Sequence, residues 1–230
     1  MDDLFGLLFR IVAGALALLV AIDVHEFSHA WAAYQLGDYT VRNRVTLNPL
    51  AHLDPVGSLF MGINLLYSTV LRAGLPLIGW GKPVVYHPQL LRKKGRAGMA
   101  IVAAAGPIAN VAAAVVFGLP VRLGIPLTSV TLQPLVITQT IAWTNLVIAA
   151  FNLIPIPPLD GFSVLLWIVN SIRTGWAYRV YATLSRLEVY GFQVLMLLIM
   201  ADWLLPFSIV SALMRPMISL GSLIAFGTGR

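Results

Sequence analysis

The sequence predicts an all-α polytopic membrane protein, and three observations carry that prediction. Of the 230 residues, 59% are apolar and only 10% are charged. The mean hydropathy is +0.86, whereas a soluble domain averages about 45–50% apolar and about 25% charged residues. The apolar residues also form long segments separated by short basic loops, which suits a lipid solvent. An ordinary soluble protein, a disordered chain and a disulfide-rich secreted module are therefore excluded.

The apolar segments predict about five to six transmembrane helices. The first, residues 4–36, would form a helix about 48 Å long, enough to cross a hydrocarbon core of about 30 Å. Further apolar segments lie at about 97–121, 131–172, 187–205 and 207–226. We expect a single membrane-embedded domain over 1–230, with a core at about 4–172 and C-terminal helices at about 187–226.

Two segments after the first helix have a less regular pattern. Residues 37–55 include the turn-forming run NPLAHLDP at 48–55, which predicts a loop with short β-strand pieces around 41–47. Residues 56–81 are apolar but interrupted by glycines and a proline, which favours a re-entrant or interfacial segment over a clean span, with a full span left open. Irregular backbone at membrane depth is tolerated only against protein or water.

The charge distribution predicts the orientation of the chain. The net charge is +6, and the bases gather in the loops at 82–96 and 173–186. Short loops rich in Lys and Arg stay in the cytoplasm, so both loops are expected inside. Basic loops of this kind favour contact with the lipid bilayer, with no nucleic acid as partner. We expect an integral, multi-pass protein (in the cell membrane if the source is prokaryotic) with its polar site toward the cytoplasmic side.

The chemistry begins with the run HEFSH at 25–29. On a helix, His25 and His29 project from one face toward one metal ion, and Glu26 is placed to take a proton from water activated there. With four histidines in the chain, chance matches to this pattern number on the order of 10⁻³. Burying such groups in lipid without partners is also costly, so a metal site is favoured over a packing role.

Two histidines leave a zinc site incomplete, because catalytic zinc usually takes three protein ligands. The chain has no Cys, so the third ligand is another residue type. The candidates are His52, His87, Asp54, Asp160, Glu188 and Asp202, with Asp23 too near in sequence to close the site easily. Asp160 is favoured because it directly follows a proline cluster inside an apolar segment, where a broken helix and a buried acid suit a wet polar site. The alternative is that Asp160 only caps the helix that restarts there.

These motifs together resemble the site-two protease family of intramembrane zinc metalloproteases, in its minimal form without accessory domains. The resemblance rests on HEFSH at 25–29 paired with NLIPIPPLDG at 152–161. Further matches are TLNPLAHLDP at 46–55 and GPIAN at 106–110. The resemblance implies a three-helix catalytic core, with His25, His29 and Asp160 as ligands of one Zn²⁺ per chain and Glu26 as the catalytic base.

The activity implied is hydrolysis of peptide bonds in or near transmembrane segments, that is, regulated intramembrane proteolysis by a zinc metalloendopeptidase. The partner would be a membrane protein or peptide with a transmembrane segment. Asn152, Asn110 and His52 are candidates for contacts with the substrate or the oxyanion, although packing between helices explains the asparagines equally well. The alternatives are a metal or proton transporter and an inactive metal-binding membrane scaffold.

Overall fold

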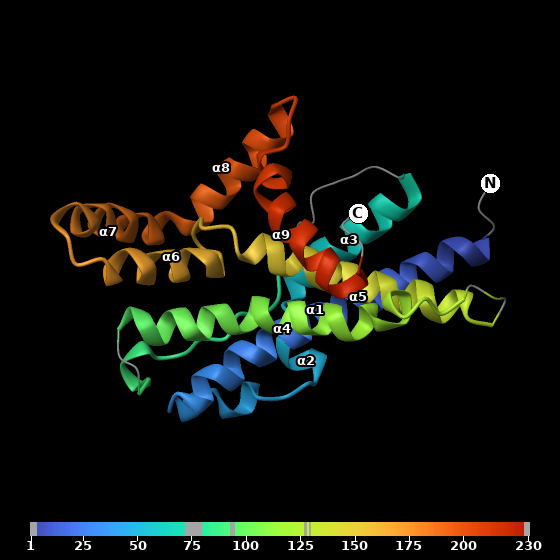
Figure 1. Cartoon of the computed structure of the whole chain (residues 1–230), viewed down its shortest axis with the longest axis horizontal. Helices are drawn as coiled ribbons and strands as arrows, with labels where there is room; N and C mark the ends of the chain where they lie inside the picture. The colour runs from blue at the N-terminus through green and yellow to red at the C-terminus, as the bar shows by residue number, and fades with distance from the viewer. Residues whose placement is uncertain (1–3, 72–79, 93–94, 127, 129, 228–230) are drawn as a thin grey trace.

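The computed structural model of the chain describes residues 4–71, 80–92, 95–126, 128 and 130–227 (Figure 1). Its α-helices are α1 (Leu4–Gln35), α2 (Pro49–His52), α3 (Pro55–Leu71), α4 (Arg96–Arg122), α5 (Leu132–Asn152), α6 (Asp160–Ser171), α7 (Gly175–Leu187), α8 (Gly191–Leu204) and α9 (Ile209–Phe226). Short 3₁₀ helices lie at η1 (Tyr39–Arg44), η2 (Pro88–Leu90) and η3 (Glu188–Tyr190).

Five helical segments in this described part are long and apolar enough to cross a membrane. They are α1, α4, α5, the continuous stretch Gly175–Leu204 that holds α7 and α8, and α9. The prediction of an all-α polytopic membrane protein is thereby confirmed, because each of these segments can satisfy its backbone hydrogen bonds internally in lipid.

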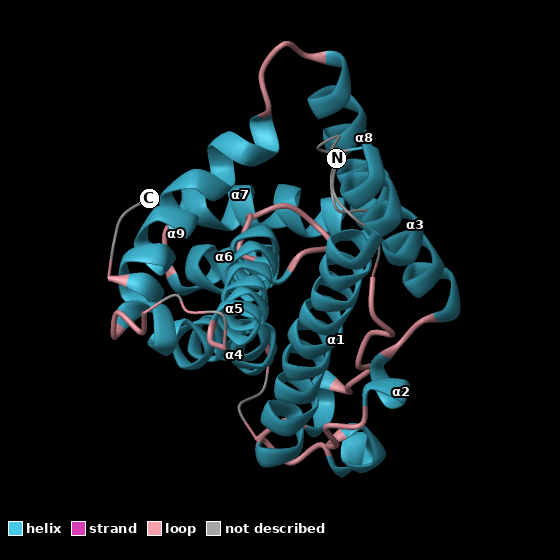
Figure 2. Cartoon of the chain, turned by 90° about the vertical axis from the view of Figure 1, so that its right-hand side faces the viewer, coloured by secondary structure: helices cyan, strands magenta, loops and turns pink. Residues whose placement is uncertain are grey.

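Helix α4 lies at the centre of the bundle and packs against α1, α5 and α6, while α9 covers α4 and α5 (Figure 1). Small residues make these close approaches possible, as in membrane helix packing generally. On α1 the buried positions include Ala17 and Ala21, and on α4 they include Gly106 and Ala114. Figure 2 shows α1 running past α4 and α5, with the 36–53 connection at its C-terminal end.

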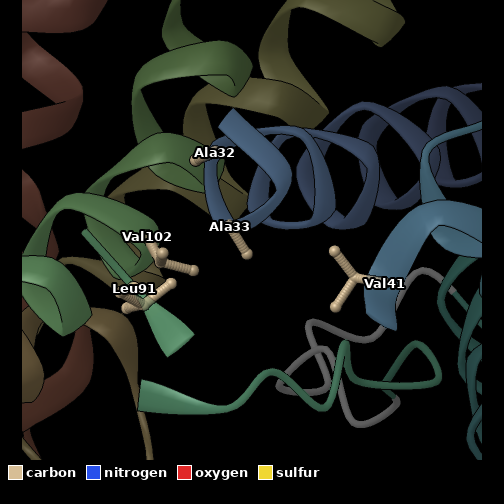
Figure 3. Close-up of a cluster of buried hydrophobic side chains, with 5 residues drawn as sticks. All are labelled: Ala32, Ala33, Val41, Leu91 and Val102. Carbon is tan, nitrogen blue, oxygen red and sulfur yellow. The ribbon is translucent and has the colours of Figure 1, made fainter. Parts of the chain in front are cut away.

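One buried apolar cluster fixes the end of α1 against α4 (Figure 3). It consists of Ala32, Ala33, Val41, Leu91 and Val102. These side chains come from α1, η1, the residue after η2, and α4, so the cluster joins the 32–41 region to the 91–102 region. It holds the α4 turn that contains Val102 against the last turns of α1, next to the His25–His29 pair.

The short β-strands expected around 41–47 do not form among the described residues. That segment instead contains η1, where the Asp38 side chain accepts hydrogen bonds from the Thr40 backbone N–H and hydroxyl. Asn48 then caps α2 by accepting from the Leu50 N–H. Local side-chain acceptors therefore stabilise helical turns where an extended chain was expected. An isolated antiparallel bridge joins Leu53 to Gly81.

Residues 55–71 form helix α3, and residues 72–79 lie outside the described part of the chain. Whether 56–81 is re-entrant or spans the membrane therefore stays an open prediction.

The helix break expected at the proline cluster is present. Helix α5 ends at Asn152, and α6 begins at Asp160 after a chain of tight turns. Gly161 is required at the restart, because a Cβ there would lie 2.2 Å from the Leu153 carbonyl oxygen. The break therefore turns the chain so that Asp160 enters the bundle at the first turn of α6.

Candidate metal centre

Helix α1 places His25 and His29 one turn apart on the face that packs against α4. Both residues are buried, with 6% and 8% of their surfaces exposed. Their Nε2 atoms lie 3.0 Å apart, and the rings meet edge to face. The spacing of four residues thus brings two imidazole nitrogens to one point, as the sequence predicted.

Asp160 brings a carboxylate to the same point from the start of α6. Its Oδ2 atom lies 3.2 Å from His25 Nε2 and 3.4 Å from His29 Nε2. This Oδ2 atom is buried and has no hydrogen-bond partner among the described residues. The N-cap of α6 is Leu159, so the helix-capping alternative does not explain the acid. A buried oxygen facing two imidazoles is the donor arrangement of a metal site.

The opposite ring nitrogens are each held by an acceptor on α4. His29 Nδ1–H donates to the carbonyl oxygen of Val102 at 2.8 Å. His25 Nδ1–H donates to Asn110 Oδ1 at 2.6 Å. With the proton on Nδ1, each neutral imidazole presents its Nε2 lone pair to the common point, and this is the usual outer support of a metal-ligating histidine.

The three donor atoms fit a tetrahedral zinc ion. Zinc–nitrogen and zinc–oxygen bonds of about 2.0–2.1 Å place neighbouring ligand atoms about 3.3 Å apart. The observed separations are 3.0, 3.2 and 3.4 Å. His25, His29 and Asp160 are also the group of metal-type donors that the described part of the chain brings together. Three protein ligands leave a fourth position for water or substrate, as in catalytic zinc sites.

Gly106 on α4 leaves the space that this cluster requires. A Cβ at this position would lie 2.5 Å from His29 Nε2 and 2.7 Å from His25 Cε1. Any side chain on Gly106 would therefore push into both imidazole rings. The structure therefore places this glycine in the wall of the site.

The other candidates for a third ligand have different partners. His87 and Asp38 pair at 3.6 Å, Asp54 accepts from the Gly57 N–H, Glu188 binds Arg96, and Asp202 accepts from the Val210 N–H and the Ser208 hydroxyl. These contacts brace loops and helix ends. In the Asp38–His87 pair, burial would raise the pKa of Asp38, but hydrogen bonds from Thr40 and the His87 backbone N–H lower this pKa below its usual value.

Glu26 follows His25 on α1 and is half-buried. Its carboxylate lies beside the backbone of Gly81, because a Cβ built on Gly81 would be 3.4 Å from Glu26 Oε1. Glu26 forms no hydrogen bond or ion pair with the described residues. It is therefore available for proton transfer, and its role as the catalytic base stays a prediction.

The predicted substrate contacts lie in different settings. Asn152 Nδ2 donates to the Ile148 carbonyl of its own helix, and the residue is half-buried at the end of α5. Asn110 is fully buried behind His25. His52 is also fully buried, with Nε2–H donating to the Thr46 carbonyl and lying 3.6 Å from Asp23 Oδ1. No contact here tests a substrate role, so these assignments stay predictions.

A helical bundle apolar enough to span a membrane, with a buried His–His–Asp donor set, is typical of a polytopic membrane protein that binds a metal ion. Comparison with known proteins gives the particular family. Residues 120–198 match the model of peptidase family M50. The chain is 33% identical over 190 residues to "Putative zinc metalloprotease YwhC" of Bacillus subtilis, which covers 80% of this chain and 78% of that protein. The chain belongs to peptidase family M50, the site-two protease family.

Other relatives are longer than the matched region. "Putative zinc metalloprotease Rip2" of Mycobacterium tuberculosis is 32% identical over 163 residues, covering 70% of this chain and 57% of that protein. The protein of the same name from Mycolicibacterium smegmatis is 34% identical over the same length and the same shares. No solved structure matches the chain.

Proposed function

We propose that this protein is an intramembrane zinc metalloendopeptidase that cleaves membrane proteins or peptides in or near a transmembrane segment. One observation carries the proposal. Three candidate metal-ligand atoms, His25 Nε2, His29 Nε2 and Asp160 Oδ2, converge inside a membrane-spanning bundle. A metal-ligand cluster with an open fourth position suits hydrolysis. Because the chain belongs to peptidase family M50, we expect the bond hydrolysed to be a peptide bond.

His25, His29 and Asp160 would hold the zinc ion. Zinc in such a donor set supplies Lewis-acid chemistry, polarising the scissile carbonyl and making water a nucleophile near neutral pH. Glu26 takes the proton from the attacking water and passes it to the leaving amine. Glu26 directly follows the ligand His25 on α1, so the base and the ligands are held on one rigid element before the substrate enters.

The proposed orientation places the site nearer to the cytoplasmic side. Ten residues of helix separate the basic end of α4 at Arg96 from Gly106, a rise of about 15 Å. Six residues separate His29 from the end of α1 at Gln35, a rise of about 9 Å. Basic loops adjoin these ends. A site at this depth is reached from the cytoplasmic interface, where an unwound transmembrane segment could enter.

The test compares the wild-type protein with Glu26→Gln, both reconstituted in liposomes with a mixture of single-span model peptides. We expect about one zinc per chain in both proteins, with cleavage products detected by mass spectrometry only for the wild type. Glutamine keeps the size of Glu26 but cannot take up the proton.

Three outcomes contradict the proposal. Equal cleavage by both proteins would remove Glu26 from the mechanism. Zinc bound without any cleavage, together with zinc or proton flux into the liposomes, would indicate the transporter alternative. Zinc bound with neither cleavage nor flux would indicate an inactive scaffold.

A further inference from the structure

Three buried polar side chains form a chain of hydrogen bonds across α5, α4 and α1. Asn145 on α5 accepts from Asn110 on α4, with Asn110 Nδ2 2.7 Å from Asn145 Oδ1. Asn110 in turn accepts from His25 on α1 at 2.6 Å. Both asparagines are completely buried. This series of hydrogen bonds therefore connects Asn145, which is remote from the site, to the candidate metal ligand His25.

The direction of each hydrogen bond follows from two backbone carbonyls. Asn110 Nδ2 lies 2.9 Å from the Ala21 carbonyl oxygen, and a carbonyl can only accept. The amide nitrogen of Asn110 must face that carbonyl, so Oδ1 faces His25. Asn145 Nδ2 likewise donates to the Ile141 carbonyl, which turns its Oδ1 toward Asn110. Oδ1 of Asn110 therefore requires the His25 proton on Nδ1.

In this arrangement every hydrogen-bonding group of the Asn110 side chain has a partner. Its two N–H groups go to the Ala21 carbonyl and Asn145 Oδ1, and its oxygen is on the His25 ring. If the amide were rotated, its oxygen would face two other acceptors, and its nitrogen would force the His25 proton onto Nε2. Asn145 supplies one of the two acceptors that oppose this rotation. Within a membrane, no water replaces a lost partner.

We propose that Asn145 is a positioning residue which, through Asn110, keeps the His25 ring in the tautomer and orientation that present Nε2 to the metal. The inference rests on the zinc part of the proposed function. It also assigns a role to a residue of α5, a helix that contributes none of the three ligands. Partners beyond the ligands are known to orient metal-bound histidines and to tune metal affinity.

The test uses Asn145→Leu and Asn145→Asp, with Thr140→Val as the matched control. Leucine removes the acceptor at similar size. A neutral aspartic acid reproduces the pattern, accepting from Asn110 and donating to the Ile141 carbonyl. Thr140→Val removes another side-chain hydrogen bond to a carbonyl four residues earlier on α5, the bond to Val136. Zinc affinity is measured by chelator competition, and the visible spectrum of the Co²⁺-substituted protein reports ligand geometry.

We expect zinc affinity to fall about tenfold in Asn145→Leu, with a changed Co²⁺ spectrum. Asn145→Asp should stay close to the wild type, and Thr140→Val should match it. Wild-type affinity and spectrum in Asn145→Leu would overturn the proposal, because a residue that only packs α4 against α5 would change stability alone. If Asn145→Leu does not fold, Asn145→Ala replaces it.

A second measurement separates this inference from the zinc proposal. In metal-free protein labelled with ¹⁵N-histidine, nitrogen chemical shifts give the tautomer of His25. We expect the proton on Nδ1 in the wild type and a mixture of tautomers in Asn145→Leu. An unchanged tautomer in the variant would contradict the positioning role, whereas a wild type that binds no zinc would contradict only the proposed function.

Discussion

Helix α1 takes part in two acid–histidine clusters, and the two are built in opposite ways. In the metal cluster, carbonyl-type acceptors hold Nδ1 of His25 and His29, so that both Nε2 atoms face Asp160. In the second cluster, the Thr46 carbonyl holds Nε2 of His52, and Asp23 lies 3.6 Å from the same nitrogen.

The difference indicates why a buried histidine beside an acid need not suit a metal ion. The ring nitrogen that faces the acid must be free of a proton, and a carbonyl on the other nitrogen secures this. His52 already donates to the Thr46 carbonyl from the nitrogen nearest to Asp23, so that nitrogen has no lone pair to offer a metal ion. Asp23 Oδ1 and His52 Nδ1 have no hydrogen-bond partner among the described residues.

Replacing the acid of each cluster by alanine should give the largest difference in zinc content between the two clusters. Asp160→Ala is expected to lose its zinc, because two histidines alone hold the ion weakly. Asp23→Ala should keep about one zinc per chain. Metal analysis of the purified proteins checks both. Loss of zinc from Asp23→Ala would show that the second cluster belongs to the metal site.

Two glycines allow the metal cluster and the proposed catalytic base Glu26 to be crowded separately. Gly106→Ala places a methyl group against both metal-ligand rings, and we expect zinc affinity to fall by about tenfold or more. Gly81→Ala places a methyl group 2.8 Å from Ile22 Cγ2 and 3.4 Å from Glu26 Oε1. It should lower cleavage while zinc affinity stays unchanged.

The measurements are chelator competition and peptide cleavage. Gly62→Ala is the control for both, since a Cβ at Gly62 on α3 meets nothing within 4 Å. Equal zinc affinities for Gly106→Ala and Gly62→Ala would contradict the placement of Gly106 against the metal ligands.

The second cluster should matter for stability rather than for metal binding. His52→Leu leaves the Thr46 carbonyl without its donor, which should lower the free energy of unfolding by about 1–3 kcal/mol. His52→Gln can still donate from its side-chain amide and should lose less. Thermal unfolding in detergent checks the order of the three proteins. Zinc content should be equal in all of them, and a lower content in His52→Gln would indicate a metal role for His52.

The smallest expected effect concerns an anchor outside both clusters. Arg96 at the start of α4 binds Glu188 through two hydrogen bonds of 2.7 and 2.8 Å and also donates to the Tyr181 hydroxyl. The pair thereby holds the end of α7, and α6 with Asp160 precedes α7 in the chain. Because both side chains are partly exposed, Arg96→Met should lower the free energy of unfolding by only about 1 kcal/mol.

Zinc affinity in Arg96→Met should stay within about twofold of the wild type, since α6 also packs directly on α4. Arg179→Met, which removes an exposed arginine of α7, is the control. A large loss of zinc in Arg96→Met would mean that the position of Asp160 depends on this anchor more than on the packing of α6.

The sequence predicted the parts of the fold and site that depend on local geometry. The first helix was expected at 4–36 and forms over Leu4–Gln35, and the break before Asp160 follows from the prolines at 155, 157 and 158. The prediction of short strands around 41–47 was wrong, because the Asp38 side chain stabilises a 3₁₀ turn there. Asp38 also accepts from the His87 N–H, a partner 49 residues away.

By itself, the sequence determined that His25 and His29 share one face of a helix and that an acid follows a break in a later helix. Both follow from helical periodicity and from the geometry of proline, which act over a few residues. Only the tertiary structure decided which nitrogens face the common point. The acceptors on Val102 and Asn110 come from α4, the partner of Asn110 comes from α5, and the tautomer of an imidazole is set by the group that folding brings to its other nitrogen.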